Sequence, residues 1–110
     1  MLTPSERDGR GLLPDGVPEA AFAFASTLIG PGDRVFLQLP GGSGESERAF
    51  RTEFARAARF YLLPASVEPE LAEATVVLSY ASDPHQLAAS FLTERRDPAV
   101  STDVSRIAPP

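Results

Sequence analysis

The chain has 110 residues and a mass of 11.7 kDa, which fits one compact domain. Fifteen acidic residues against ten basic ones, all ten of them arginine, give a formal net charge of -5, so nucleic acid is not expected as a partner. The absence of cysteine excludes a disulfide framework, a thiolate nucleophile and a cysteine-ligated metal, and one histidine leaves little for a zinc site. We therefore expect no metal and no cofactor.

The distribution of apolar residues predicts the location of the protein. No stretch approaches the roughly 20 apolar residues that a membrane span requires. The amino terminus also lacks the basic segment followed by an apolar one that marks a secretory signal. We expect a cytoplasmic protein that makes no membrane contact.

The chain begins with a segment that has no regular pattern. Residues 1–17 mix proline, glycine and charge and predict a flexible leader, whereas residues 18–107 are expected to form a single domain followed by a tail at 108–110. A helix from Pro18 to Ile29 is predicted because alanine is abundant there, Pro18 suits a first turn, and Gly30 with Pro31 reads as a stop.

A strand and a helix follow. Arg34–Leu39 is rich in β-branched and aromatic residues and lies between turn residues, so it predicts a strand. From Glu45 to Tyr61 the apolar residues recur at helical spacing and predict a helix, whose start either Ser43 or Ser46 could cap.

The second half of the chain predicts three extended segments and a further helix. The extended segment 60–67 is expected at a sheet edge because Pro64 cannot donate to a ladder, and Ala74–Tyr80 reads as a buried strand. Asp83, Pro84 and Gln86 match a helix cap, and the helix is expected to continue past Leu87 towards Arg95. The alternating residues 100–105 predict an edge strand.

This order of elements predicts an α+β fold with a ferredoxin-like βαββαβ sandwich preceded by an amino-terminal helix. The two most apolar strands would then lie in the centre of the sheet. The alternative is a small three-layer α/β fold, in which the second and third strands would both run parallel to the first. A hairpin between the second and third strands would distinguish the ferredoxin-like fold.

The first and third strands also resemble those of the RNA-recognition motif. VFLQLP is similar to the first-strand signature of that family, with Phe36 at its stacking position, and LSY matches the end of the second signature. The resemblance implies a ferredoxin-like order. Thr75 and Val77 stand where the third strand of the family carries stacking rings, so RNA binding by this face is not expected.

Alternation along the two central strands predicts which residues face the helices. Val35, Leu37 and Leu39, with Val76, Leu78 and Tyr80, would pack under the helices, because residues i and i+2 share a face. Phe36 and Val77 would lie on the other face, which the amino-terminal helix, a second copy of the chain or a ligand could cover. They are candidate interaction residues and suggest a homo-oligomer.

The glycine-rich loop Pro40–Ser46 is a candidate ligand site. Backbone N–H groups before a helix can hold an anion, so Gly41, Gly42, Ser43 and Gly44 are candidate contacts for a nucleotide or another small ligand. The loop resembles a P-loop, with Glu45 in place of the lysine, and the stretch PGDRVFLQLPGGSGE resembles the first motif of methyltransferases that use S-adenosylmethionine. A plain strand-to-helix connection is the alternative interpretation.

Arginines gather on the predicted helix. Arg48, Arg56 and Arg59 form a stripe, with Arg51 beside it, and could bind an acidic partner. The alternative is a solvated face, in which Glu47 supports Arg51 at an i, i+4 spacing. His85 has no evident partner, and no catalytic constellation stands out. We expect a non-enzymatic interaction or regulatory module that self-associates, with a small-ligand or nucleotide-binding domain as the alternative.

Overall fold

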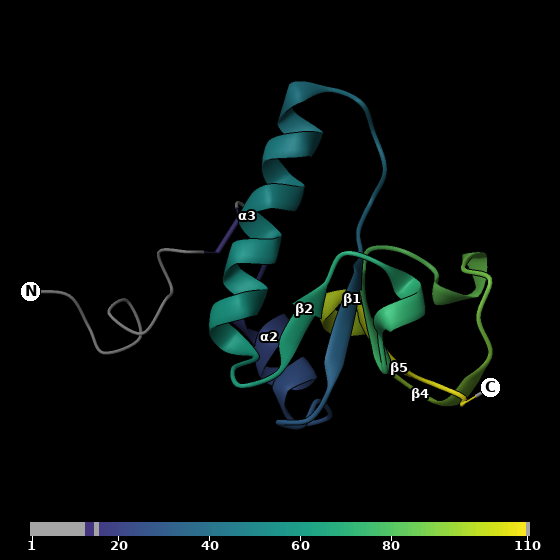
Figure 1. Cartoon of the computed structure of the whole chain (residues 1–110). Helices are drawn as coiled ribbons and strands as arrows, with labels where there is room; N and C mark the ends of the chain where they lie inside the picture. Colours follow the sequence, from purple (N-terminus) through teal and green to yellow (C-terminus); the bar gives the residue numbers. More distant parts are fainter. Residues whose placement is uncertain (1–12, 15, 110) are drawn as a thin grey trace, which may run out of the picture.

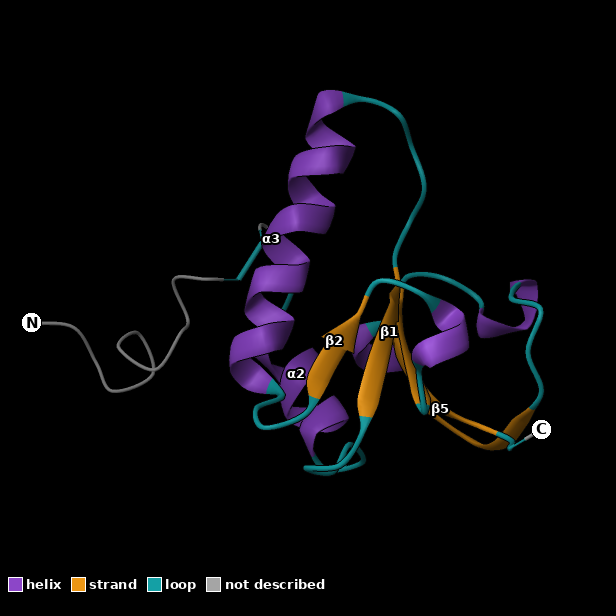
Figure 2. Ribbon diagram, viewed as in Figure 1, coloured by secondary structure: helices purple, strands orange, loops and turns teal. Residues whose placement is uncertain are grey.

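The computed structural model describes residues 13, 14 and 16–109, in which two helices pack against a five-stranded sheet (Figures 1 and 2). The α+β class is thereby confirmed. Three single-turn 3-10 helices lie in the connections of this part of the chain, at Leu71–Glu73, Pro84–Gln86 and Pro98–Val100. The main elements are α2 (Glu19–Ser26), β1 (Arg34–Gln38), α3 (Glu45–Tyr61), β2 (Ser66–Glu68), β3 (Val76–Tyr80), β4 (Phe91–Asp97) and β5 (Thr102–Ile107).

The sheet is mixed, with the strand order β2-β1-β3-β5-β4. β1 lies between β2 and β3 and runs parallel to both, whereas β5 runs antiparallel to β3 and to β4. Parallel neighbours cannot be joined by a tight turn. The long helix α3 accordingly connects β1 to β2 (Figure 1).

The ferredoxin-like strand order is not confirmed. β1 and β3 are adjacent and parallel, as that order requires, but β2 pairs with the far side of β1 instead of forming a hairpin with β3. Phe60 and Tyr61, which the sequence placed in both the helix and the extended segment, belong to α3; β2 comprises only Ser66–Glu68, and residues 69–75 carry the chain across β1 to β3. The strand order implied by the resemblance to the RNA-recognition motif is therefore absent from the described sheet.

The predicted helix after Asp83 is wrong. Its first turn forms as expected, because the Asp83 carboxylate accepts from the His85 backbone N–H at 2.9 Å, but the turn ends at Gln86. Phe91–Asp97 is instead the edge strand β4, so β5 becomes an internal strand with residues 102–105 buried. Pairing with β5 overrides a helical pattern that only local spacing supported.

Both helices cover one face of the sheet. The ring of Phe22 in α2 lies 5.0 Å from that of Phe54 and 5.1 Å from that of Tyr61, both in α3. These rings pack over Val35 and Leu78, which confirms the predicted helix-facing set. Val17, which the sequence assigned to the leader, also belongs to this core; residues 1–12 of that leader lie outside the described residues.

The opposite face of the sheet is covered by the segment that follows β3, not by α2. The Gln38 side chain donates to the Asp83 carbonyl at 2.8 Å and accepts from the Ser79 hydroxyl at 2.7 Å. Pro84 is buried, and Val77 beneath this face is 0% exposed. A region that the sequence left open to a partner is thus filled largely by the chain itself.

The amino-terminal ends of the central strands are joined by one carboxylate. Asp33 accepts two hydrogen bonds from the Arg106 guanidinium, at 2.8 and 3.0 Å, one from the Thr75 hydroxyl and one from the Gly30 N–H. The Arg106 contact is the main reason that the pKa of Asp33 falls from 3.8 to about 2, against an opposing effect of burial. This network fixes the end of β1 that lies away from the glycine-rich loop.

Candidate functional pocket

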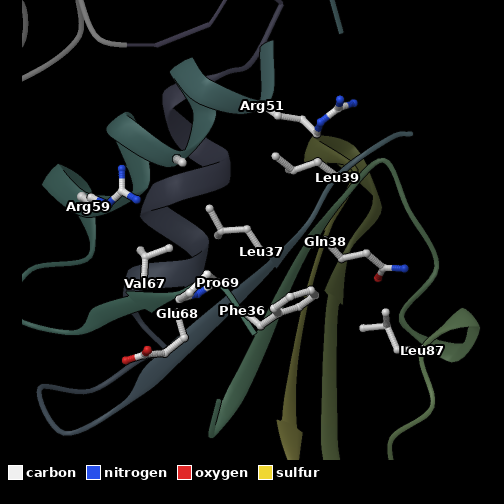
Figure 3. Close-up of a pocket in the computed structure, with 11 residues that line it drawn as sticks. Phe36, Leu37, Gln38, Leu39, Arg51, Arg59, Val67, Glu68, Pro69 and Leu87 are labelled. Atoms are coloured by element: carbon white, nitrogen blue, oxygen red, sulfur yellow. The ribbon is translucent and has the colours of Figure 1, made fainter. Parts of the chain in front are cut away.

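A pocket of about 470 Å³ lies where β1 and β2 meet α3 (Figure 3). Its volume is within the range of small-ligand sites and of pockets for a few residues of a partner. The carboxyl-terminal half of β1 forms one wall, one face of α3 a second, and the end of β2 with Pro69 a third. Leu87, from the segment after β3, closes the side next to Phe36.

The pocket exists because β2 is shorter than β1. β1 pairs with β3 as far as Gln38, but its pairing with β2 ends at Phe36 opposite Glu68. Pro69 comes next and has no N–H to continue a ladder. The space beside Leu37 and Leu39 is therefore not taken by a strand.

The inner surface of the pocket is mostly apolar. Leu37 and Leu39 point from β1 towards α3, and Val67 of β2 lies beside them (Figure 3). Facing them from α3 is Ala55, whose single methyl group leaves room that a larger side chain would fill. This surface can accept an apolar side chain from a ligand.

Two arginines of α3 border this apolar surface. Arg51 and Arg59 lie four residues before and after Ala55, so all three share one helix face. Within the described part of the chain, no acidic side chain forms an ion pair with Arg51 or Arg59. Arg51 donates only a long hydrogen bond, 3.4 Å, to the Pro40 carbonyl.

The expected support of Arg51 by Glu47 is not present. Glu47 instead folds back onto the glycine-rich loop, where its Cγ stands 2.6 Å from the position of a Cβ on Gly42 and its carboxylate crowds that of a Cβ on Gly44. Arg51 thus keeps its charge available at the pocket. The carboxylate of the pocket itself, Glu68, lies on the side away from the two arginines and accepts from the Ser66 hydroxyl at 2.9 Å (Figure 3).

The candidate ligand loop is separate from this pocket. Gly41, Gly42, Ser43 and Gly44 are exposed and rise from β1 to the start of α3 (Figure 1). Gly44 is the N-cap residue and neither predicted serine cap forms, while Glu45 and Glu47 place two acids in the first helical turn. These acids make the loop less favourable for an anion.

The predicted interaction residues divide into three groups. Phe36 and Arg59 both line the pocket, which brings together two residues that the sequence assigned to different faces. Arg48 and Arg56 are exposed on α3 outside the pocket lining. Val77 is buried within the chain and is not accessible to a partner in this fold.

Some residues of the pocket escaped sequence reasoning. The sequence assigned no role to Ala55, predicted Leu87 only as part of a helix, and indicated Arg51 only as a neighbour of the arginine stripe. The i, i+4, i+8 spacing of Arg51, Ala55 and Arg59 places all three on one helix face, which the sequence alone could have shown. Leu87 has no such signal, since its predicted helix does not form.

Elsewhere, the structure brings His85 to an unexpected partner. Its Nε2 lies 2.5 Å from a carboxylate oxygen of Glu94, and its Nδ1 lies 3.8 Å from Asp83. All three side chains are substantially exposed. No group of three or more histidine or acidic residues in the described ranges has the arrangement of a metal site.

Comparison of the chain with protein-family models, with curated proteins and with solved structures gives no match. Its function therefore has to be inferred from the pocket and its surroundings. No helix among residues 13, 14 and 16–109 combines the length and the apolar character needed to cross a membrane.

Proposed function

We propose that this protein is a non-enzymatic interaction module that binds an acidic segment of a partner protein in the pocket between β1 and α3. The observation that carries the proposal is the pair of arginines, Arg51 and Arg59, at an apolar surface of a chain whose net charge is -5. In the same chain Arg96 and Arg106 are each bound by a carboxylate. Arg34, Arg48, Arg56 and Arg95 likewise form no ion pair among the described residues, but Arg51 and Arg59 are the two arginines that line this pocket.

The chemistry of the pocket favours a ligand that is both apolar and acidic. Guanidinium groups hold carboxylates through directed, charge-assisted hydrogen bonds, and Leu37, Leu39 and Val67 would take an apolar side chain between them. Exposed ion pairs each contribute only a few tenths of a kcal/mol to about 1 kcal/mol. Binding would therefore depend on the apolar contact as well as on the two ion pairs. Moderate affinity suits a regulatory contact.

Self-association by the surfaces that the sequence indicated is not part of the proposal. Ala21, Phe22 and Ala25 of α2 are buried in the core of the same chain, and Val77 is covered on the opposite face. Nucleotide binding by the Pro40–Ser46 loop stays a prediction without support from the loop's geometry.

The proposal can be tested by titration with a defined peptide. The probe is a fluorescein-labelled, blocked peptide of about seven residues with the order Ser-Glu-Ser-Val-Ser-Glu-Ser. Replacing Arg51 and Arg59 together by alanine should weaken its binding roughly tenfold, as expected for the loss of two exposed ion pairs. Fluorescence anisotropy gives the affinity, and amide shifts of Leu37 and Leu39 locate the site.

Arg95→Ala is the matched control, because Arg95 is an exposed arginine on β4, far along the sheet from the pocket. Its binding should equal that of the parent protein. Glu68→Gln should strengthen binding, since it removes the one acid of the pocket lining. Absence of binding, or equal binding by the double variant and the parent, would refute the proposed function.

A further inference from the structure

We infer that the acidic segment binds as an added β-strand along β1, in line with β2 and beyond its end. This inference rests on the proposed function and specifies the form of the partner: an extended peptide with acids at positions i and i+4 and an apolar residue midway. Strand addition of this kind gains affinity from main-chain hydrogen bonds and specificity from alternate side chains.

The backbone of β1 presents open positions to the pocket. The Asp33 carbonyl accepts from the Ser66 N–H on the β2 side, whereas the Arg34 carbonyl accepts from the Thr75 N–H on the β3 side. Because successive residues of a strand direct their polar groups to opposite edges, those of Leu37 and Leu39 face the β2 side. The Leu37 carbonyl and the Leu39 N–H lie past Phe36, the last β1 residue that pairs with β2.

The surrounding elements keep this edge accessible. Pro69 stops β2, and the chain then turns away towards the 3-10 helix at Leu71–Glu73. The loop before α3 is long and carries the start of the helix well clear of the end of β1 (Figure 1). Leu87 borders the other face near Phe36 and leaves the edge itself free (Figure 3).

The spacing of the arginines sets the spacing of the acids. At about 1.5 Å per residue, the eight helical residues from Arg51 to Arg59 span about 12 Å. Four residues of an extended strand span about 13 Å, so acids at i and i+4 match the two arginines. The residue at i+2 shares the face of the two acids and would lie opposite Ala55, midway between the two arginines.

The charges on both sides favour an acidic peptide over another occupant. Arg51 and Arg59 attract the acids of the peptide. Glu68, at the end of β2, repels a further acid placed next to it and so limits how the peptide can be aligned along β1. A second copy of this chain would have to supply an exposed strand with the same acid spacing. In β4, the exposed edge strand, the acids are Glu94 and Asp97, three residues apart and on opposite faces.

Backbone methylation of the peptide probe tests strand addition directly. A strand has two edges, so N-methyl groups on alternate residues block one edge and leave the other free. The Ser-Glu-Ser-Val-Ser-Glu-Ser peptide would be made in two forms, methylated on one or the other set of alternate amides. We expect one form to bind at least tenfold more weakly than the parent and the other to bind within about twofold of it.

The spacing of the acids in the peptide and the hydrogen exchange of the protein's amides provide two further tests. Moving the second acid to i+3, where it points to the opposite face, should weaken binding several-fold at constant composition. Binding of the parent peptide should slow hydrogen exchange of the Leu39 amide, because that N–H would gain a partner. Arg95→Ala protein should reproduce all of these results.

The outcomes separate the two proposals. If both methylated forms bind like the parent peptide while the Arg51 and Arg59 double variant loses affinity, strand addition is wrong, but the proposal that the pocket binds an acidic segment still stands. Equal competition by free glutarate at matched carboxylate concentration would also overturn strand addition. If no peptide binds, or if the double variant binds normally, the proposed function itself fails.

Discussion

Asp33 shows how much one side chain can hold together. Its carboxylate joins the turn after α2, the start of β3 and the end of β5 through Gly30, Thr75 and Arg106. The Arg106 side chain also donates to the Leu28 carbonyl at 3.2 Å, so the corner beneath α2 is tied to the sheet. Local sequence patterns do not predict this network, because Asp33 and Arg106 are 73 residues apart.

The lowered pKa of Asp33 predicts how stability depends on acid. A carboxylate whose pKa is about 2 when folded and 3.8 when unfolded stabilises the fold above pH 4, and the contribution disappears as pH falls towards 2. Asp33→Asn should cost about 2 kcal/mol at pH 7 and remove this dependence. Urea unfolding at several pH values measures both effects.

Asp97→Asn is the control for that experiment, since its carboxylate accepts one local hydrogen bond from Ala99 N–H. We expect Asp97→Asn to lower the free energy of unfolding by well under 1 kcal/mol, as a typical surface substitution does. Its free energy of unfolding should change between pH 4 and 2 as that of the parent protein does. A parent protein whose stability is constant over this range would contradict the role given to Asp33.

Phe22 is the aromatic residue that fixes α2. It is 1% exposed and lies between the rings of Phe54 and Tyr61. Phe22→Ala should therefore cost about 3–5 kcal/mol of unfolding free energy, the usual effect of deleting a buried ring. Phe60→Ala, at a phenylalanine that is 42% exposed, should cost far less. Equal midpoints in chemical denaturation would show that α2 is not part of the core.

At the scale of elements, the accuracy of prediction depended on the kind of signal. α3 was predicted with its observed bounds, because its apolar residues recur over about three turns. The region after Asp83 was predicted as a helix and became a 3-10 turn and β4, because a short cap pattern says nothing about strand pairing. β2 was expected at an edge and lies there, although in only three residues.

The segment between β3 and β4 is held against the sheet by side-chain hydrogen bonds. Gln38 links it to the sheet through the Asp83 carbonyl and the Ser79 hydroxyl. Gln38→Ala leaves the buried Ser79 hydroxyl without this partner and leaves the Asp83 carbonyl with only the Gln86 N–H, so we expect a loss of about 1–3 kcal/mol and faster hydrogen exchange in residues 81–90. Gln86→Ala, at an exposed glutamine, is the control and should change neither quantity. Unchanged exchange in Gln38→Ala would mean that other contacts hold this segment.

At the scale of the whole molecule, the sheet edges decide whether the chain can self-associate. β2 is short and followed by Pro69, and β4 carries Glu94, Arg95 and Arg96 along an exposed edge. Short and charged edge strands oppose edge-to-edge pairing. Ala21, Phe22 and Ala25 of α2 are buried within the same chain, as is Val77, so of the residues expected to mediate a homo-oligomer Phe36 remains accessible, in the pocket.

We therefore expect a single species of 11.7 kDa in sedimentation equilibrium at micromolar concentration. Phe36→Asp should leave this mass unchanged and should weaken peptide binding in the pocket. A dimer mass in the parent protein would contradict this expectation, and Thr93→Pro, which disrupts the β4 edge, would then show whether that edge forms the contact.

Four features could be predicted from sequence alone: the α+β class, the helix Glu45–Tyr61, the two apolar strands beside each other in the sheet, and the residues that face the helices. These features follow from local periodicity and from burial patterns that a single segment carries. The sequence also placed Phe36 and the α3 arginines among the candidate contacts. It could not place them in one pocket.

The strand order, the cover over Val77 and the gap beside Leu37 and Leu39 depend on contacts between distant segments. Each depends on which strand pairs with β1 and where that pairing stops, and pairing between distant segments leaves little trace in local spacing. Sequence spacing likewise cannot predict that the Glu47 side chain contacts the glycine-rich loop and not Arg51. The pocket arises where β2 ends before β1 does.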